Sequence, residues 1–304
     1  MGRLGGSDQD QDQDQDQDQA QGNGGGRRLT VQNSAVYATQ LEPTEFPSPG
    51  DPEYKQAQEA ADRVKYPEFW NPELRAYVYL EEFVSTPRKE PWLTTLLGTI
   101  DKLHTDLRNE RGKQLRAILE LADERDKRRG EIVDQHGAEG AIKYWLRVLQ
   151  VIPAHAPATH QLVRIGRRVG EHVVMCLKEH YQEARPSQIC PAIVPLIEVP
   201  WHPSFPAGHA LQSHLISMCL DAIAPRRKQH EMLFHLSRRV AENRVIAGLH
   251  YPLDNEAGIE AAKKCFELLS EGPKFRALVA DAQLEYRRQS ESREARFARD
   301  HAGR

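Results

Sequence analysis

The sequence predicts an all-α protein built as a helical bundle. Between residues 92 and 270 the apolar residues recur at intervals of three and four, the spacing of one face of an α-helix. Stretches in which apolar and polar residues alternate, as in a half-buried strand, are almost absent. Prolines separate the periodic segments, and a proline ends a helix because it lacks a backbone N–H and clashes with the preceding turn. These three observations together favour helices packed on helices.

The first 33 residues are of low complexity and contain the repeat QDQDQDQDQDQ followed by QGNGGGRR. This alternation has no apolar face to bury, so we expect residues 1–33 to form a disordered tail. From 34 to 92 eight prolines interrupt the chain, which predicts short helices and irregular connections.

The first long helical pattern covers 92–129, with Leu103, Leu107, Leu115, Ile118 and Leu121 as apolar positions. A helix over 141–152 ends before Pro153. The next, 158–184, stops at Arg185-Pro186, and its apolar stripe consists of Leu162, Ile165, Val169, Val173 and Leu177.

A proline-rich loop, 187–208, leads into a helix that starts near His209. A helix over 230–249 follows, with the stripe Met232, Leu233, Leu236, Val240 and Ala247, and another begins after Pro252 and continues to residue 270. The charged segment 285–304 indicates a solvated helix or a frayed tail. We therefore predict an all-α domain at 34–285, preceded by the tail 1–33 and followed by a charged tail at 286–304.

The charge is balanced outside the N-terminal tail. The chain has 41 Lys and Arg against 44 Asp and Glu, and six Asp and three Arg lie in residues 1–33, leaving 38 of each sign. This composition gives no reason to expect nucleic acid as a partner. No apolar run approaches the ~20 residues that span a bilayer, and polar residues fill the place of a signal peptide. We expect a cytoplasmic protein without a membrane span.

Four cysteines lie far apart without CxxC spacing, which favours half-buried reduced thiols over a zinc site or disulfides: Cys176, Cys190, Cys219 and Cys265. The thirteen histidines include no HxxxH pair on a helix beside a third ligand, so we expect no metal site of that kind. His214, His230 and His235 have no partners apparent in the sequence, and we expect surface or half-buried positions for them.

The ends of the core helices carry polar residues suited to one chemistry. Lys178 and Arg185 are seven residues apart, which would place them on one face of a helix. Gly208 and His209 open the next helix, where backbone N–H groups attract anions. The remaining members follow on the later helix ends: Arg244, His250 and Asp254.

This set is suited to a tetrahedral oxyanion. Arginines offer planar forks to its oxygens, a lysine adds a point charge, and the amide of Gly208 adds a donor aligned with the helix dipole. One histidine can attack or coordinate the central atom while the other transfers a proton. Asp254 can fix the tautomer of His250. Taken singly, each residue has a plainer interpretation: solvated charge for Lys178, Arg185 and Arg244, a structural role for His250, and an N-cap for Asp254.

The order and spacing of these residues resemble a known three-part signature: Lys178, six residues, Arg185-Pro186; Pro206-Ala207-Gly208-His209; then Arg244, five residues, His250, three residues, Asp254. The pattern is similar to that of the type 2 phosphatidic acid phosphatase and vanadium haloperoxidase superfamily. It covers about 170–260. The resemblance implies a helical bundle of that type, with an oxyanion site at converging helix ends.

The resemblance also implies roles. Lys178, Arg185, Arg244 and the Gly208 amide would bind phosphate or vanadate oxygens. In the phosphatases, the position of His250 is the nucleophile and that of His209 protonates the leaving group. In the haloperoxidases, the His250 position is the axial ligand of vanadium, the only metal contact implied, the His209 position is an acid–base, and the Lys178 position polarises peroxide.

Two positions refine this picture. The signature usually has serine where this chain has Ala207, so one hydroxyl donor to the oxyanion is missing, and a hydrogen bond to a charged group is worth about 1.5–3 kcal/mol. His202 lies where bromoperoxidases of the superfamily carry histidine and chloroperoxidases phenylalanine, so it is a candidate for tuning the halide or substrate.

Three functions follow as hypotheses. The first is a vanadate-dependent haloperoxidase that oxidises bromide or another halide with hydrogen peroxide. The second is a phosphomonoester phosphatase that needs no cofactor and works through a phosphohistidine at His250. The third is a phosphate-binding homologue in which Ala207 marks weakened catalysis. A homodimer is possible, as in several members of the superfamily.

Overall fold

The computed structural model describes residues 50–62, 70–136, 142–223 and 225–301, and all regular secondary structure in these ranges is helical. The all-α prediction is confirmed. The chain divides into two compact units, residues 1–65 and 66–304. The first contains helix α2 (Pro52–Asp62), and the predicted tail at 1–33 lies outside the described residues.

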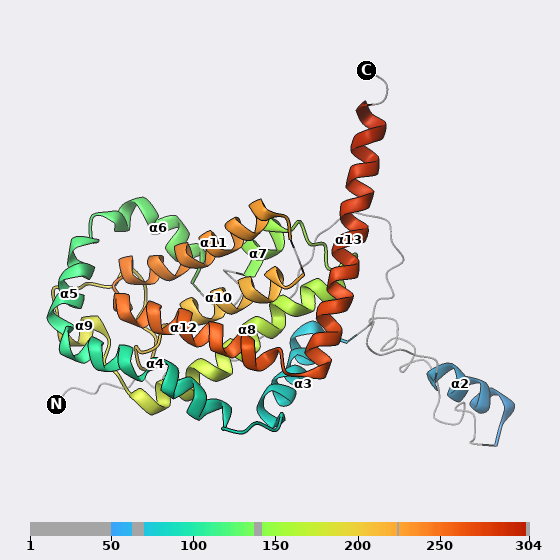
Figure 1. Cartoon of the computed structure of the whole chain (residues 1–304), viewed down its shortest axis with the longest axis horizontal. Coiled ribbons are helices and arrows are strands. Elements are labelled where there is room, and N and C mark those ends of the chain that lie inside the picture. Colours follow the sequence, from blue (N-terminus) through green and yellow to red (C-terminus); the bar gives the residue numbers. More distant parts are fainter. Residues whose placement is uncertain (1–49, 63–69, 137–141, 224, 302–304) are drawn as a thin grey trace, which may run out of the picture. The chain divides into compact units, whose positions relative to one another are not determined.

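The second unit contains the bundle, whose arrangement is seen in Figure 1. Its helices are α3 (Pro72–Ser85), α4 (Trp92–Asn109), α5 (Arg111–Glu120), α6 (Glu124–Asp134), α7 (Ile142–Val148), α8 (Pro157–Tyr181), α9 (Pro186–Ile189), α10 (Gly208–Asp221), α11 (Arg227–Ile246), α12 (Pro252–Leu269) and α13 (Pro273–His301). Helix α13 continues through the charged segment after residue 285.

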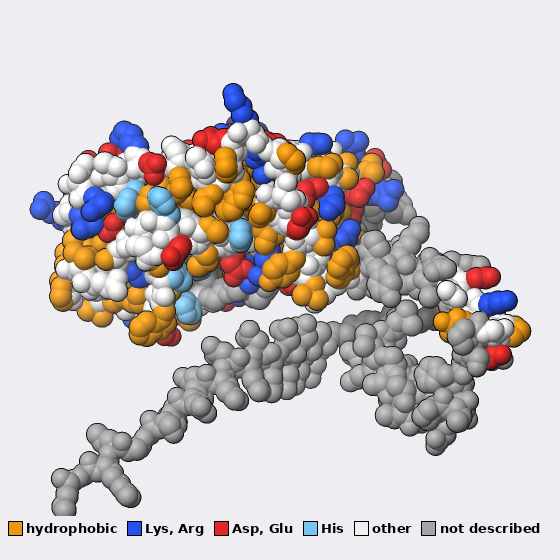
Figure 2. All heavy atoms as spheres, turned by 90° about the horizontal axis from the view of Figure 1, so that it is seen from below, with side chains coloured by type: hydrophobic (Ala, Val, Ile, Leu, Met, Phe, Trp, Pro, Cys, Tyr) orange, Lys and Arg blue, Asp and Glu red, His pale blue; other side chains and the backbone are white. Residues whose placement is uncertain are grey.

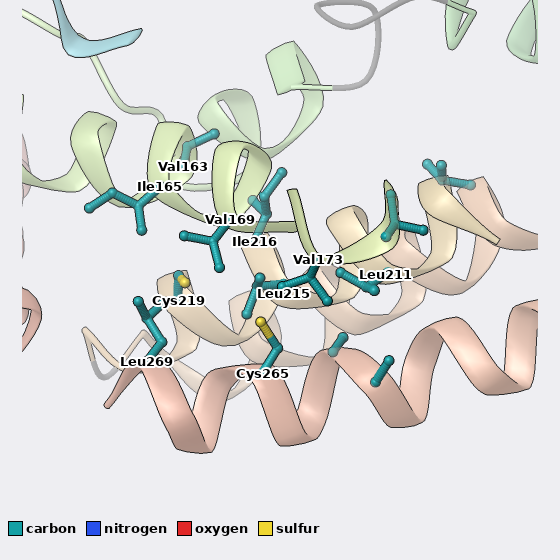
Figure 3. Close-up of a cluster of buried hydrophobic side chains, with 14 of the residues drawn as sticks. Val163, Ile165, Val169, Val173, Leu211, Leu215, Ile216, Cys219, Cys265 and Leu269 are labelled. Atoms are coloured by element: carbon teal, nitrogen blue, oxygen red, sulfur yellow. The ribbon is translucent and has the colours of Figure 1, made fainter. Parts of the chain in front are cut away.

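The core lies where α10 packs against α8, α11 and α12 (Figure 1). All five predicted stripe residues of α8 are buried. Figure 3 shows Val169 and Val173 of α8, Leu211 and Leu215 of α10, and Cys265 of α12 meeting between the three helices. Burial of such side chains is worth roughly 1.5–3 kcal/mol each, so this contact fixes how the helix ends are placed.

Two glycines let α8 and α10 approach closely. A Cβ atom at Gly166 would lie 2.9 Å from Cγ1 and 3.0 Å from Cα of Ile216, and one at Gly170 would lie 3.0 Å from Cγ of Gln212. The first distance is shorter than real Cβ contacts, and the other two are tighter than most of them. The backbone of α8 at these two glycines therefore packs directly against residues of α10, over one turn of α8.

Several helix boundaries differ from the sequence-based expectation. The pattern 92–129 is divided into α4, α5 and part of α6, because the helix is interrupted at Glu110 and again after Glu120. Leu107 and Ile118 are both fully buried although they lie on different helices, so the bends wrap the apolar stripe around the bundle. Helix α7 ends before Gln150, which has a positive φ of 54°.

The burial predictions for Met232 and His214 are wrong. Met232 is 52% exposed, because its neighbour Leu233 occupies the buried face of α11. His214 is buried rather than half-buried, with Nδ1 3.2 Å from the Ser237 hydroxyl, whereas His230 and His235 are exposed as predicted.

The four cysteines are free thiols, as predicted, but the expectation that all four are half-buried is wrong for two of them. Cys219 and Cys265 are fully buried in the core (Figure 3), while Cys176 and Cys190 are half-buried.

The surface carries both charges. On the face shown in Figure 2, Lys and Arg side chains are interspersed with Asp, Glu and apolar side chains. Across the part of the chain that the structure describes, no helix combines the length and the apolar character that crossing a bilayer requires.

Candidate functional site

A cavity of about 260 Å³ opens where α8, α10 and α11 converge. Six of the predicted site residues line it: Lys178, His202, Gly208, His209, Arg244 and His250. Asp254 and Arg185 lie behind this wall and contact His250. The structure therefore gathers eight of the nine predicted residues in one place, although they span 76 positions of the chain from 178 to 254.

Ala207 is the exception. It precedes α10 and is fully buried, but it packs in an apolar cluster with Ala210 and Ala241 and does not line the cavity. Its amide donates to the carbonyl of Asp254 at 2.9 Å. Helix α10 begins without a side-chain cap, so its first N–H groups remain available to an anion beside Gly208.

The end of α8 separates two residues that we expected on one helix face. Lys178 lies in the last turn, but Gln182 adopts a left-handed conformation (φ 49°) and terminates the helix. Arg185 is therefore outside α8 and forms the N-cap position of the short helix α9. The prediction of a shared helical face is wrong, because the chain turns before Arg185, yet both side chains reach the same site.

His250 is held in one orientation and one tautomer. Its Nδ1 lies 3.1 Å from Oδ2 of Asp254, and its Nε2 lies 3.5 Å from Nη1 of Arg185. A guanidinium can only donate, so Nε2 carries a lone pair and Nδ1 carries the proton. Asp254 also accepts from the Tyr251 amide at 3.0 Å and from the Ser204 hydroxyl at 2.5 Å. The carboxylate is thereby fixed and in turn fixes the ring.

Arg185 organises the loop that precedes α10. Its Nε donates to the carbonyl of His202 at 3.0 Å, its Nη1 donates to the carbonyl of Leu249 at 3.0 Å, and its Nη2 lies 3.1 Å from Nδ1 of His202. The side chain is 1% exposed. Because most of its donors have protein partners, Arg185 contributes its charge and orders His202 and His250.

Lys178 is also almost fully buried. Its Nζ donates to the carbonyls of Pro203 and Ser204, at 2.5 and 2.7 Å. An ammonium has three donors, so one hydrogen remains for a ligand in the cavity. Burial, reinforced by the charge of Arg185, lowers the pKa of Lys178 to about 7.

Arg244 is a buried cation whose guanidinium has two nitrogens without a hydrogen-bond partner in the described part of the chain. The residue is 1% exposed, and neither Nε nor Nη1 has a hydrogen-bond partner among the described residues. A buried, unpaired cation costs several kcal/mol, so a donor left open in this way indicates a missing acceptor. Burial and the charge of Arg185 lower the pKa of Arg244 to about 10, which leaves it cationic at neutral pH.

His209 is oriented from outside the signature region. Its Nε2 lies 3.2 Å from the carbonyl of Gln135, the C-cap of α6, and therefore carries the proton. The Gln135 side chain accepts from Asn243 Nδ2 at 2.9 Å, and both residues are buried. The remaining nitrogen, Nδ1, has no hydrogen-bond partner in the described part of the chain.

The electrostatics of the site favour an anion. Burial comes first, and the neighbouring cations second, in lowering the pKa of His209 to about 3 and that of His250 well below its usual range. The pKa of His202 falls to about 4 for the same reasons. His202, His209 and His250 are thus neutral at pH 7 when no ligand is bound. Burial raises the pKa of Asp254 to about 6, while the hydrogen bonds from Ser204 and the Tyr251 amide act in the opposite direction.

Three contributors were missed from the sequence. Ser204 lies in the proline-rich loop before α10, but its contact with Asp254 spans 50 positions. Gln135 and Trp145 come from α6 and α7, outside 170–260, and carry no motif. Only the polarity of Ser204 within a proline-rich loop could have indicated it.

Comparison with models of known protein families finds no match, and comparison with curated proteins finds none either. Within the described ranges no group of three or more His, Cys, Asp or Glu residues could hold a metal ion.

Proposed function

We propose that this site binds a tetrahedral oxyanion and hydrolyses phosphate monoesters through His250. The observation that carries the proposal is Arg244, whose buried Nε and Nη1 lack partners in a cavity bordered by two oriented histidines. A phosphoryl group would supply the acceptors for Arg244, the third hydrogen of Lys178 and the N–H groups at the start of α10. An apolar extension of the same cavity offers space for the alcohol part of an ester. Halide and peroxide alone would not need this space.

In the first step the lone pair of His250 Nε2 attacks phosphorus. A P–N bond forms, the ester P–O bond breaks, and the leaving alkoxide takes a proton from His209. Asp254 stabilises the positive charge that develops on the His250 ring through Nδ1. His209 must be protonated beforehand, and the dianionic substrate raises its depressed pKa because opposite charges favour each other.

In the second step water attacks the phosphorus of the phosphohistidine. The P–N bond breaks, His209 accepts the proton that the water loses, and inorganic phosphate leaves. His250 returns to its starting tautomer. Throughout, Lys178 and Arg244 stabilise the charge on the non-bridging oxygens in a largely enclosed site, where such contacts are stronger than in water.

The second candidate is the haloperoxidase, and the position of His202 favours it. Its ring lines the cavity and is held by Arg185 at the place where bromoperoxidases of the superfamily carry histidine. The donor set fits vanadate, because the open donors of Arg244 suit any tetrahedral oxyanion and Nε2 of His250 has a free lone pair. When bound, vanadate would supply peroxide activation. The protein's part would be to hold the anion with Lys178 and Arg244.

The test is rapid quenching of the full chain with ³²P-labelled phenyl phosphate. We expect alkali-stable, acid-labile label that turns over, and loss of both label and turnover by at least about a thousandfold in His250→Ala. His235→Ala, an exposed histidine on α11, is the matched control and should be unaffected. Turnover that survives in His250→Ala would contradict the phosphohistidine.

The same preparations distinguish the other two hypotheses. Bromide oxidation by peroxide after loading with orthovanadate, dependent on His250 and without ester hydrolysis, would place the haloperoxidase first. Phosphate binding without either activity would instead indicate a binding protein.

A further inference from the structure

The cavity continues beyond the oxyanion site as a trough between α8 and α10. On α10 it is lined by His209, Gln212 and Ile216, which are three and four residues apart and so share one helix face. At 1.5 Å per residue the trough extends ~10 Å from His209 to Ile216. Lys178 lies at the same end as His209, and Val174 follows along α8.

The trough has a large apolar wall, and the polar side chains beside it already have protein partners. Gln212 Nε2 and the Ser213 hydroxyl donate to the carbonyls of Arg167 and Ala210, each at 3.3 Å, and Arg167 and Glu171 form ion pairs with Glu73 and Arg168. The apolar wall includes Val174, Ile216, Val240 and Trp145, all buried. The indole N–H of Trp145 already donates to the Ser217 hydroxyl at 2.7 Å. A hydroxyl group placed against this wall would lose its hydrogen bonds to water and gain none, which costs about 1–3 kcal/mol.

The floor of the trough is closed. Gly166 and Gly170 bring α8 against Ile216 and Gln212, so a ligand cannot pass between the two helices. The cavity volume of about 260 Å³ also limits the ligand. At the ~30 Å³ that one water molecule occupies in the liquid, it holds about nine non-hydrogen atoms, and five of these belong to the phosphate.

We propose that the ligand is a phosphate monoester of a compact apolar alcohol, with about four to five carbon atoms. The ester's phosphate lies at His209 and its carbon chain lies along α10 as far as Ile216. The proposal rests on the proposed function for turnover, but not for binding. It disfavours sugar phosphates, whose hydroxyls would face Val174 and Trp145, and double-chain lipids, which exceed the volume.

The experiment measures the full chain against n-alkyl phosphates from methyl to octyl. We expect kcat/KM to rise about fourfold per methylene, the value of one buried methylene, and to level off beyond pentyl. Pentyl phosphate and glycerol 1-phosphate have the same number of non-hydrogen atoms, and pentyl phosphate should be at least about a hundredfold better. Equal rates for that pair, or a rise that continues through octyl, would overturn the proposal.

Ile216→Ala should move the plateau to longer chains, because it lengthens the trough. Leu220→Ala, a buried leucine on the same helix that does not line the cavity, is the control for lost stability and should leave the plateau unchanged. An unchanged plateau in Ile216→Ala, with the protein folded, would contradict the placement of the chain along α10.

Binding of n-alkylphosphonates, measured by calorimetry on the unmodified chain, separates the two proposals. Affinity that rises with chain length in the absence of hydrolysis would support the ligand class and reject the phosphatase. Hydrolysis without chain-length preference would reject the ligand class and retain the phosphatase. Absence of both binding and hydrolysis would reject the two together.

Discussion

Ser204 donates its hydroxyl hydrogen to Oδ2 of Asp254 at 2.5 Å, in a fully buried contact between residues 50 positions apart. The same oxygen faces Nδ1 of His250. The hydroxyl oxygen also lies 3.4 Å from Nδ1 of His250, so Ser204 contacts the carboxylate and the ring together. The orientation of His250 therefore depends on the loop before α10 as well as on α12.

Ser204→Ala should lower kcat about ten- to hundredfold, because a hydrogen bond to a charged group is lost. The lost bond also removes an influence that lowers the pKa of Asp254, so that pKa rises above about 6. Activity that requires the ionised carboxylate will then be lost, as the pH is lowered, at a higher pH than in the unmodified chain. The pH dependence of kcat measures this shift. Ser237→Ala, a buried serine bonded to His214, should leave the profile in place.

Asn243→Ala should impair proton donation by His209, because it releases the Gln135 side chain next to the carbonyl that orients the ring. Acid catalysis matters most when the leaving group is a poor one. We expect hydrolysis of alkyl phosphates to fall about tenfold, and that of 4-nitrophenyl phosphate to change little. Asn255→Ala, which loses a bond to the carbonyl of Ala241, is the matched control. Equal losses for both substrates would exclude a role through His209.

Sulfate should bind more tightly as the pH falls through about 7. Sulfate keeps its two charges over this range, so the change must come from the protein. The pKa of Lys178 is lowered to about 7, and the residue loses its positive charge as the pH rises through that value. Calorimetry from pH 7 to 8.5, above the pKa of about 6 for Asp254, should show this dependence, and Lys178→Met should remove it. If Lys178→Met keeps the same dependence of sulfate affinity on pH, another group is the one that titrates.

Gly166→Ala should destabilise the fold by about 1–3 kcal/mol, since the added methyl meets the backbone of Ile216. Gly98→Ala is the matched control on α4, where a Cβ has open space. It should stabilise the fold by about 0.5–1 kcal/mol, because alanine loses less entropy in a helix. Urea unfolding of both variants gives the comparison, and a neutral Gly166→Ala would show that the helices can separate without cost.

The periodic core could be predicted from the sequence and the helix interruptions could not. The stripe from Leu162 to Leu177 is a local pattern that one face of one helix must bury, and all of it is buried. The interruption at Glu110 has no proline to mark it and reflects how α4 and α5 wrap around their neighbours. Met232 and Leu233 are both apolar, and only packing decides which of them turns inward.

The candidate site, like the fold, could be predicted from the sequence only in part. Its members on successive helix ends could be grouped from spacing and charge. Ser204 and Gln135 could not, because their contacts with Asp254 and His209 connect segments 50 and 74 residues apart. Arg185 was placed in the right site for the wrong local reason, since the left-handed Gln182 ends α8 before it.

The unpaired donors of Arg244 link the binding of an anion to the stability of the native state. A ligand that binds only the native chain shifts the unfolding equilibrium by mass action, by about 1.4 kcal/mol for each tenfold rise in free ligand above its dissociation constant. Without a bound anion, the cationic side chains of the site repel one another. The melting temperature of the bundle should therefore rise with the oxyanion concentration of the solution. In a buffer without phosphate or another oxyanion, proteases should cleave the chain faster than they do in phosphate buffer.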